Sequence, residues 1–316
     1  MESQQGQASP STWKDPRRKI LAAILAAAIV CAALFGYGLY SYLSGSDAGD
    51  SSAIAAGDLV TMNYIGRTPE GRVFDTSIYS VASNDAMYPK SLTFSLRENT
   101  TYVPFNMTAG NYGSGGTIKG FALGVIGLHT GDHVTIEIAQ GEGYEIVPQL
   151  TLWQNLEEDV PLVEIMTTED FTDNFLTTPV PMAILPHYFW GWDVQVVEIL
   201  AGVVTVKNLP TVGGTVYPFG NPDDPLDPSG WPVEVLSCDL VNQKITVKHH
   251  LSASDVYSIK GTDIDGKTLI VTGFNGDNGT FQVGKSDPSS GYNAEIAGRT
   301  LFFEITIIKV TPAEGE

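Results

Sequence analysis

A few patterns in the sequence have the residue types to bind phosphate or a metal ion. Residues 110–116 (GNYGSGG), followed by Thr117, Ile118 and Lys119, suggest a phosphate-binding loop. Such a loop needs Gly-Lys-Ser/Thr at a set spacing at the start of a helix, and that motif is missing. We therefore predict a flexible surface loop at 110–116.

Acidic clusters and histidines give equally weak signals for metal chemistry. Residues 263–266 (DIDG) and 223–227 (DDPLD) lack the glycine and glutamate positions of an EF-hand loop, so turns are predicted there. His249 and His250 are neighbours in a strand-like run and would face opposite sides. No Gly-x-Ser-x-Gly or His-Glu-x-x-His motif occurs. The sequence therefore predicts no metal, no cofactor and no hydrolase.

Composition narrows the class of protein. The formal net charge is −19, which argues against a nucleic-acid partner, because that partner needs Lys and Arg to displace counterions. Apolar residues make up 43%, enough for a sizeable core, and the 33 glycines and 18 prolines favour a β-rich fold. The acidic balance suits an archaeal or bacterial surface protein. Two cysteines, one of them in an apolar run, make no disulfide framework.

One segment is long and apolar enough to cross a membrane. Residues 20–43 carry no charge over 24 positions, and a helix needs about 20 to span a bilayer. Four basic residues precede the segment, so the positive-inside rule predicts a cytoplasmic tail at 1–19 and extracytoplasmic domains after the anchor. A cleaved signal peptide is the alternative, although its apolar region is usually shorter. Residues 44–57, small and polar, are predicted to be a flexible linker.

A hairpin, a helix and two further strands are the predicted elements that would position a site. Residues 59–65 and 73–75 alternate around a turn at 68–71, which predicts a hairpin. Residues 118–127 have helical spacing, and 133–138 and 301–310 are strand-like.

The long region between 148 and 296 predicts a separate β domain. Its helix signal is 167–175, with Thr167 or Thr168 as N-cap, and residues 209–231 are predicted to form a long loop. Its predicted strands are 192–199, 203–208, 232–238, 244–251, 268–273 and 280–283. The aromatic cluster at 187–192, with apolar residues before it, predicts either an exposed patch beside a binding pocket or the core of this domain.

Four segments in order carry a resemblance to a known family. They are 64–77 (YIGRTPEGRVFDTS), 118–132 (IKGFALGVIGLHTGD), 136–144 (IEIAQGEGY) and 300–305 (TLFFEI). Together they resemble the FKBP-type peptidyl-prolyl cis-trans isomerases. The gap between the last two segments resembles the insert-in-flap, SlyD-like and archaeal subclass, whose inserted domain acts as a chaperone. Residues 293–301 (NAEIAGRTL) look like that subclass's re-entry motif, with Ala294 where His is usual.

The resemblance implies an α+β fold. An FKBP-like antiparallel sheet, formed by 58–147 and 297–312, would curl around a short helix. A large β-rich domain, 148–296, would be inserted in the flap, and one transmembrane helix would lie at the N-terminus. Phe121 stands where many members carry Trp, and this insert is unusually long.

The resemblance also implies a pocket. Its catalytic residues would be Tyr64, Phe74, Asp75 and Tyr144, and its substrate-binding residues Phe105, Thr117, Ile118, Phe121 and Phe303. Rotation about an X–Pro bond meets a barrier of about 18–20 kcal/mol because the twisted amide loses resonance. A dry aromatic pocket favours that less polar, twisted amide without a nucleophile or metal. The implied role of the Ile118 N–H and the Tyr144 hydroxyl is to hold substrate carbonyls.

Two functions follow from these expectations. The first is a membrane-anchored prolyl isomerase that acts on unfolded or proline-containing polypeptides outside the cytoplasm, with a chaperone insert. The alternative is a non-catalytic chaperone or binding module on a degenerate scaffold of the same family. Asn99, Asn106 and Asn278 begin Asn-x-Thr triplets that match glycosylation acceptors.

Overall fold

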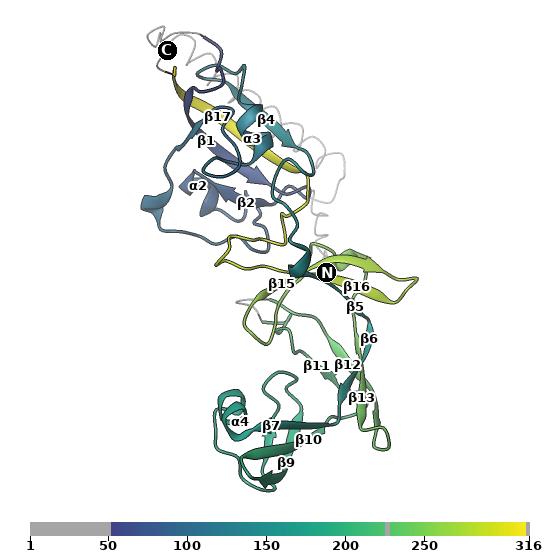
Figure 1. Cartoon of the computed structure of the whole chain (residues 1–316). Helices are drawn as coiled ribbons and strands as arrows, with labels where there is room; N and C mark the ends of the chain where they lie inside the picture. The colour runs from purple at the N-terminus through teal and green to yellow at the C-terminus, as the bar shows by residue number, and fades with distance from the viewer. Residues whose placement is uncertain (1–51, 225–227, 314–316) are drawn as a thin grey trace, which may run out of the picture. The chain divides into compact units, whose positions relative to one another are not determined.

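The computed structural model of the chain describes residues 52–224 and 228–313 (Figure 1). Within the described residues, 53–224 and 228–313 form one unit of mixed α and β structure, mostly strands with few helices. The predicted cytoplasmic tail (1–19) and membrane segment (20–43) lie outside the described residues. Among the described helices, none has the length and hydropathy to cross a membrane.

One antiparallel sheet organises the split domain, which comprises residues 53–147 and 297–313. Its two inner strands are β1 (Leu59–Arg67) and β17 (Leu301–Thr311), which pair along their whole length. β4 (His133–Ile138) pairs with the other side of β17, and β2 (Val73–Thr76) and β3 (Phe105–Thr108) pair with the two ends of β1. The strand that follows the insert therefore lies inside the sheet that begins before it. The hairpin and both strands predicted here are confirmed.

Helix α3 (Lys119–Gly124) packs closely against β4. A Cβ on Gly120 or Gly124 would come within 2.7 Å of Ile138 or Ile136, so only glycine permits this approach. The helix is shorter than the predicted 118–127, because its N-cap, Ile118, is extended, with ψ 143°. The side chains buried in this core include Ile54, Val60, Met62, Met107, Phe121, Ala122, Val125, Ile138, Leu301, Phe303, Ile305 and Ile307.

Two smaller features of the split domain refine the predictions. Residues 79–103, which have no clear period, contain helix α2 (Tyr79–Ala82) and the 3-10 turn η2 (Asn99–Thr101). The linker predicted at 44–57 ends too late, because Ile54 is only 2% exposed and exchanges backbone hydrogen bonds with Gly127 and Leu128. A single isoleucine among small residues shows no periodicity, so its burial could not be predicted from the sequence.

The insert contains three antiparallel sheets of four strands each, with orders β7-β10-β9-β8, β11-β12-β13-β6 and β14-β15-β16-β5. Their strands are β5 (Thr151–Asn155), β6 (Glu157–Pro161), β7 (Val163–Thr167), β8 (Ile184–Pro186), β9 (Asp193–Leu200), β10 (Val203–Leu209), β11 (Thr215–Val216), β12 (Val233–Asp239), β13 (Lys244–His249), β14 (Lys260–Thr262), β15 (Thr268–Asn275) and β16 (Thr280–Lys285). Two 3-10 turns, η3 (Pro148–Leu150) and η4 (Ala253–Asp255), complete it. All three sheets contribute to one hydrophobic core. The six strands predicted from the sequence are confirmed.

The segment 151–167 joins the three sheets. It forms β5, β6 and β7 in succession, and each is the edge strand of a different sheet. Between them, the amides of Leu156 and Leu162 donate to Gly279 and Gln243, and Leu162 is buried. The sequence did not reveal these strands, because their residues do not alternate regularly between apolar and polar types; β6 (EEDVP), for example, is almost entirely polar.

Helix α4 (Thr168–Phe175) forms as its sequence predicts. Thr167 is the N-cap: its hydroxyl accepts from the amide of Asp170 at 3.0 Å, and the Asp170 carboxylate reaches back to it. Phe171 and Phe175 stack at 4.5 Å on the side that faces the insert core.

The aromatic cluster at 187–192 belongs to the insert core rather than to an exposed patch. Trp190 and Trp192 are 9% and 6% exposed and stack at 4.8 Å. The Trp192 indole donates to Asn208 at 2.7 Å, which satisfies its polar atom inside the core. His187 is buried as well and pairs with Glu164 at 3.1 Å. The expectation of an exposed patch is wrong for His187, Trp190 and Trp192, whereas Tyr188 is 37% exposed.

The end of the insert is tied to the split domain by buried polar contacts. The Glu295 carboxylate, 1% exposed, accepts from the amides of Leu92 and Thr93, both at 2.8 Å. Arg299 stacks over the ring of Tyr257, 3.7 Å from its centroid, and forms an ion pair with Glu70. Residues far apart in sequence are thereby fixed at the point where the chain re-enters the sheet.

Candidate active site

Five aromatic rings from five elements of the split domain meet in one cluster. They are Tyr64 (β1), Phe74 (β2), Phe105 (β3), Phe121 (α3) and Phe303 (β17). The Phe121 and Phe303 centroids lie 4.6 Å apart, those of Phe74 and Phe303 5.5 Å, and those of Tyr64 and Phe105 5.8 Å. The structure thus brings together aromatic residues that the sequence separates by up to 239 positions, counted from Tyr64 to Phe303.

The cluster is closed at its base and open at one side. Phe121 and Phe303 are only 3% and 4% exposed and form the base. Tyr144 stands edge-on to Phe74 at 6.4 Å and is 38% exposed, so it lies at the open side. Phe74 and Phe105 are half-buried between these extremes. An apolar ring such as proline's would lose water on entering this space.

A carboxylate is fixed beside the rings. The Tyr64 hydroxyl donates to Asp75 Oδ2 at 2.5 Å, and Arg97 donates to Oδ1 at 3.0 Å. Arg97 also donates to the carbonyl of Thr76 at 2.9 Å and lies 4.9 Å over the ring of Tyr102. Asp75 is therefore held from two sides with a fixed orientation.

The electrostatics keep both pocket tyrosines neutral. Burial raises the pKa of Tyr64, and the nearby Asp75 charge raises it further. Burial and the Asp75 charge also raise the pKa of Tyr144. Both phenols therefore remain hydrogen-bond donors across the physiological range.

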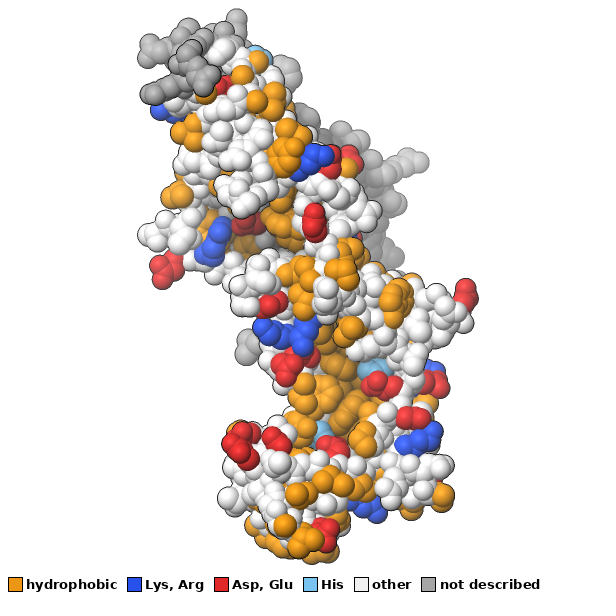
Figure 2. Space-filling view, viewed as in Figure 1, with side chains coloured by type: hydrophobic (Ala, Val, Ile, Leu, Met, Phe, Trp, Pro, Cys, Tyr) orange, Lys and Arg blue, Asp and Glu red, His pale blue; other side chains and the backbone are white. Residues whose placement is uncertain are grey.

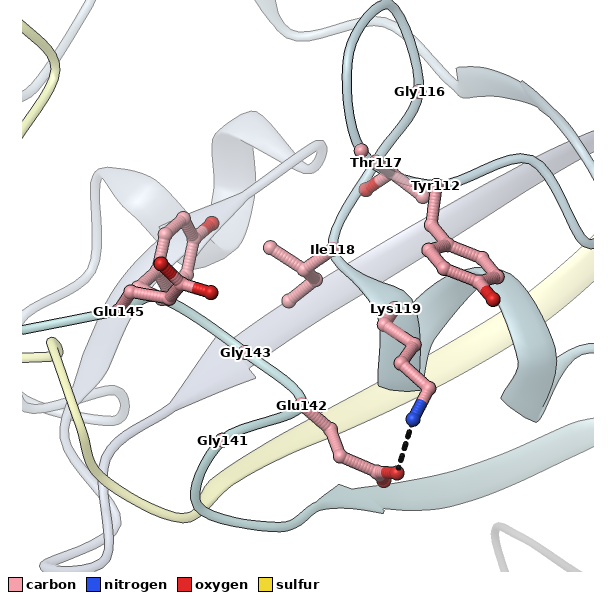
Figure 3. A pocket seen from close by; sticks show the side chains of 11 residues that line it. Tyr112, Gly116, Thr117, Ile118, Lys119, Gly141, Glu142, Gly143 and Glu145 are labelled. Carbon is pink, nitrogen blue, oxygen red and sulfur yellow. Dashed lines mark hydrogen bonds and ion pairs between the residues drawn. The ribbon is translucent and has the colours of Figure 1, made fainter.

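Two donors at the open side have no acceptor in the described part of the chain. Ile118 is the N-cap residue of α3, and its carbonyl accepts from the amides of Phe121 and Ala122. Its own N–H, like the Tyr144 hydroxyl, makes no hydrogen bond among residues 52–224 and 228–313. Both residues line one cavity of about 590 Å³, as does Thr117 (Figure 3). Two free donors beside an apolar ring cluster are suited to hold the carbonyls of a peptide.

Every site residue expected from the sequence lies in the ring cluster, in the network around Asp75 or along this cavity. Arg97 is a participant that sequence reasoning missed. It lies in a segment without periodicity, 22 positions after Asp75, and no local pattern points to it. Tyr112, Lys119, Glu142 and Glu145, which also line the cavity, were missed as well, because surface loops give no spacing signal.

The acidic turn at 263–266 forms as predicted. Asp263 Oδ1 accepts from the amides of Asp265 and Lys267 at 3.0 and 2.7 Å, and Lys285 pairs with the same side chain. Within the described ranges, His, Cys, Asp and Glu side chains form no group of three that could hold a metal ion.

Comparison with known proteins agrees with this geometry. Residues 50–149 match the family model of FKBP-type peptidyl-prolyl cis-trans isomerases. A short-type peptidyl-prolyl cis-trans isomerase of Methanocaldococcus jannaschii is 29% identical over 153 residues, which span 48% of this chain and 81% of that protein. The chain therefore contains an FKBP-type domain and has a distant relative named as a prolyl isomerase.

Proposed function

We propose that the split domain catalyses cis-trans isomerisation of X–Pro peptide bonds. The observation that carries the proposal is the ring cluster with two free donors at its open side, Ile118 N–H and Tyr144 O–H. The proline ring enters the aromatic cluster, while the donors hold the flanking carbonyls. The dry base formed by Phe121 and Phe303 favours the twisted amide, which is less polar than the planar one.

Proline-limited refolding tests this activity directly. Full-length protein should accelerate the slow refolding phase, which takes tens to hundreds of seconds uncatalysed. Phe74→Ala and Asp75→Ala should each reduce kcat/KM by at least about tenfold, since one removes a wall and the other the anchor of Tyr64. Glu137→Ala, on the exposed face of β4, is the control. Acceleration that survives both pocket substitutions would contradict the proposal.

We also propose that the insert captures unfolded clients and that residues 20–43 anchor the protein, with the split domain outside the cytoplasm. The apolar surface of the insert supports the first part. Figure 2 shows hydrophobic side chains in a hollow over β11 and β12 and again over the sheet of β7 to β10. The exposed large hydrophobic residues on that sheet are Ile165, Ile184, Val197, Leu200, Val203 and Leu209, at 37–71%. Such an apolar face is unusual on a protein with a net charge of −19 and favours a binding role.

Two paired variants test client capture. Ile165→Ser with Leu200→Ser should lower acceleration of protein refolding and leave turnover of a proline tetrapeptide unchanged. Leu240→Ser with Val241→Ser is the matched control, because these residues are 65% and 90% exposed in the β12–β13 turn. Equal losses from both pairs would remove the support for a specific capture surface.

Excision of the insert tests the same idea on a larger scale. Replacing 149–291 by a short Gly-rich loop keeps Glu295 and its contacts to Leu92 and Thr93. The split domain should still fold, because loop-closure cost grows only with the logarithm of length. Tetrapeptide turnover should persist and protein refolding activity should fall. Loss of a cooperative unfolding transition would show that the split domain depends on the insert.

A further inference from the structure

The cavity lined by Ile118 and Tyr144 lies outside the ring cluster, because none of the five rings is among its lining residues. Its volume is about 590 Å³, more than a proline side chain occupies. Beyond Ile118 and Tyr144, its walls come from Tyr112, Lys119, Glu142 and Glu145. Figure 3 shows Tyr112 and Glu145 on opposite sides of this space, with Ile118 between them. A second side chain of a bound peptide can therefore lie here.

The wall that carries Tyr112 is the glycine-rich loop 110–116, which is closed by backbone hydrogen bonds. Gly113 donates to Thr117, Gly116 to Gly113, and Thr117 to Asn111, at 3.0–3.3 Å. A Cβ on Gly116 would lie 2.6 Å from the Asn111 carbonyl oxygen, so the loop closes only with glycine there. The loop holds the Tyr112 ring, 49% exposed, at the edge of the cavity.

The charges in the cavity do not cancel. Lys119 Nζ pairs with Glu142 Oε1 at 3.2 Å, and the Glu142 carbonyl accepts from Gly120. That pair is neutral as a unit. Glu145 is exposed and has no partner among the described residues, so one negative charge remains uncompensated. The net charge of −19 adds a long-range field of the same sign.

We infer that this cavity is a subsite for a basic residue, Lys or Arg, within two positions of the isomerised proline. The inference rests on the proposed isomerase function and names the substrate class it prefers. The aliphatic stem of the basic side chain packs on Ile118, and its cationic head lies near Glu145. The ring of Tyr112 supplies a cation–π face on the opposite wall.

Peptides that differ in one side chain test the subsite. Lysine is compared with norleucine, an uncharged residue with a similar stem, at each of the two positions before and after the proline. Both kcat/KM and Kd, by fluorescence anisotropy, are measured with full-length protein at low salt. Lysine should be favoured about threefold to fivefold at one of these positions, the upper range of an exposed ion pair. No preference at any position would overturn the inference.

Two glutamine variants separate a local site from the general field. Glu145→Gln should abolish the lysine-to-norleucine ratio, and Tyr112→Ala should reduce it while Tyr112→Phe keeps it. Glu137→Gln removes the same charge from exposed β4 and should leave the ratio as it is. A ratio that falls equally in Glu137→Gln and Glu145→Gln would show that only the overall charge acts, and the subsite would be rejected.

Substitutions in the Lys119–Glu142 pair test whether the preference for lysine follows the charge of the cavity. Lys119→Met leaves Glu142 unpaired, so the preference for lysine should increase. Glu142→Gln frees Lys119, and the preference should decrease or pass to glutamate. Shifts in the opposite directions would contradict the arrangement. If no peptide were turned over, the isomerase proposal would fail, while the Kd ratios would still decide whether the subsite exists.

Discussion

The split domain and the insert both gather aromatic side chains, but only one of them leaves an opening. In the split domain, Tyr144 and Asp75 stay partly exposed beside the rings. In the insert, Trp190, Trp192 and Trp231 are buried, and the indoles of the last two donate to Asn208 and His249. The difference teaches that a dense aromatic stretch does not identify a site. Hydrogen-bond donors without a partner beside the rings are the better indicator of a site, because the polar atoms of a protein core are normally hydrogen-bonded within it.

The two regions differ in the same way in the contacts of their buried polar side chains. In the insert, the Nδ1 atoms of His187 and His249 accept from N–H donors, while their Nε2 atoms face Glu164 and Glu158 at 3.1 and 3.2 Å. These networks are complete within the domain. In the split domain, Asp75 is held from two sides, while its side chain stays 40% exposed. The buried polar groups of the insert are satisfied within the insert, whereas Asp75 in the split domain borders the candidate site.

Among the substitutions that test this comparison, Trp231→Ala is expected to have the largest effect. Trp231 is fully buried, stacks on Phe219 at 4.2 Å and donates to His249. Its loss should lower the free energy of unfolding of the insert by about 3–5 kcal/mol. Four of the five tryptophans lie in the insert and the other is Trp13, so urea unfolding followed by tryptophan fluorescence reports on the insert.

Trp153→Ala is the control for that experiment. Trp153 is 56% exposed on β5, so the same truncation should change the unfolding free energy by less than about 1 kcal/mol. Tetrapeptide turnover at 25 °C should change less than twofold in both variants. If Trp231→Ala abolished turnover, the two regions would not be separable as argued.

The next largest effect should come from the connection between the two regions. Glu295→Ala removes a buried carboxylate that accepts from Leu92, Thr93 and the Thr93 hydroxyl. Thermal unfolding should show a loss of about 2–3 kcal/mol, because charged hydrogen bonds are lost and two amides stay unpaired. Glu137→Ala should be neutral. An equally small effect in both variants would mean that the junction contributes little.

A smaller effect is expected at the open site. Arg97→Ala should reduce kcat/KM for a tetrapeptide by about threefold to fivefold, because its pair with Asp75 is partly exposed. Arg97→Lys should recover only part of this loss, since a lysine ammonium lacks the planar guanidinium that lies over the ring of Tyr102. Arg72→Ala serves as the control. Full recovery by lysine would show that charge alone, and not geometry, positions Asp75.

The smallest change is expected from alkaline pH. Raised pKa values mean that Tyr64 and Tyr144 keep their protons where an ordinary tyrosine, near pH 10, begins to ionise. Catalysis should therefore stay within twofold between pH 8 and about 10, and it should fall only when these phenols ionise. A tyrosine absorbance titration, compared with Tyr64→Phe and Tyr144→Phe, checks the assignment. A drop in activity near pH 9 that disappears in either variant would contradict it.

Local patterns predicted much of the fold. The cap at Thr167, the β1–β2 hairpin, and the strands β4, β9, β10, β12, β13, β15, β16 and β17 depend on neighbouring residues and alternation, which the sequence displays. The ring residues were reached through the family resemblance, and the structure brings them together. Their roles in catalysis remain a proposal.

Tertiary structure decided the rest. The edge strands β5 to β7 are set by partners up to about 130 residues away, such as Gly284 opposite Thr151, and their own alternation is too weak to show it. Arg97 reaches Asp75 because an irregular segment folds back on β2, and no spacing rule describes such a path.

The aromatic residues 187–192 could have been surface or core by sequence alone. Burial decided between them, because only the folded insert supplies Asn208 for the Trp192 indole and Glu164 for His187. By itself the sequence determined the elements that local alternation or capping specifies, such as β1, β17 and α4, because those depend on neighbouring residues. The non-local pairing of the chain decided the edge strands and which side chains meet.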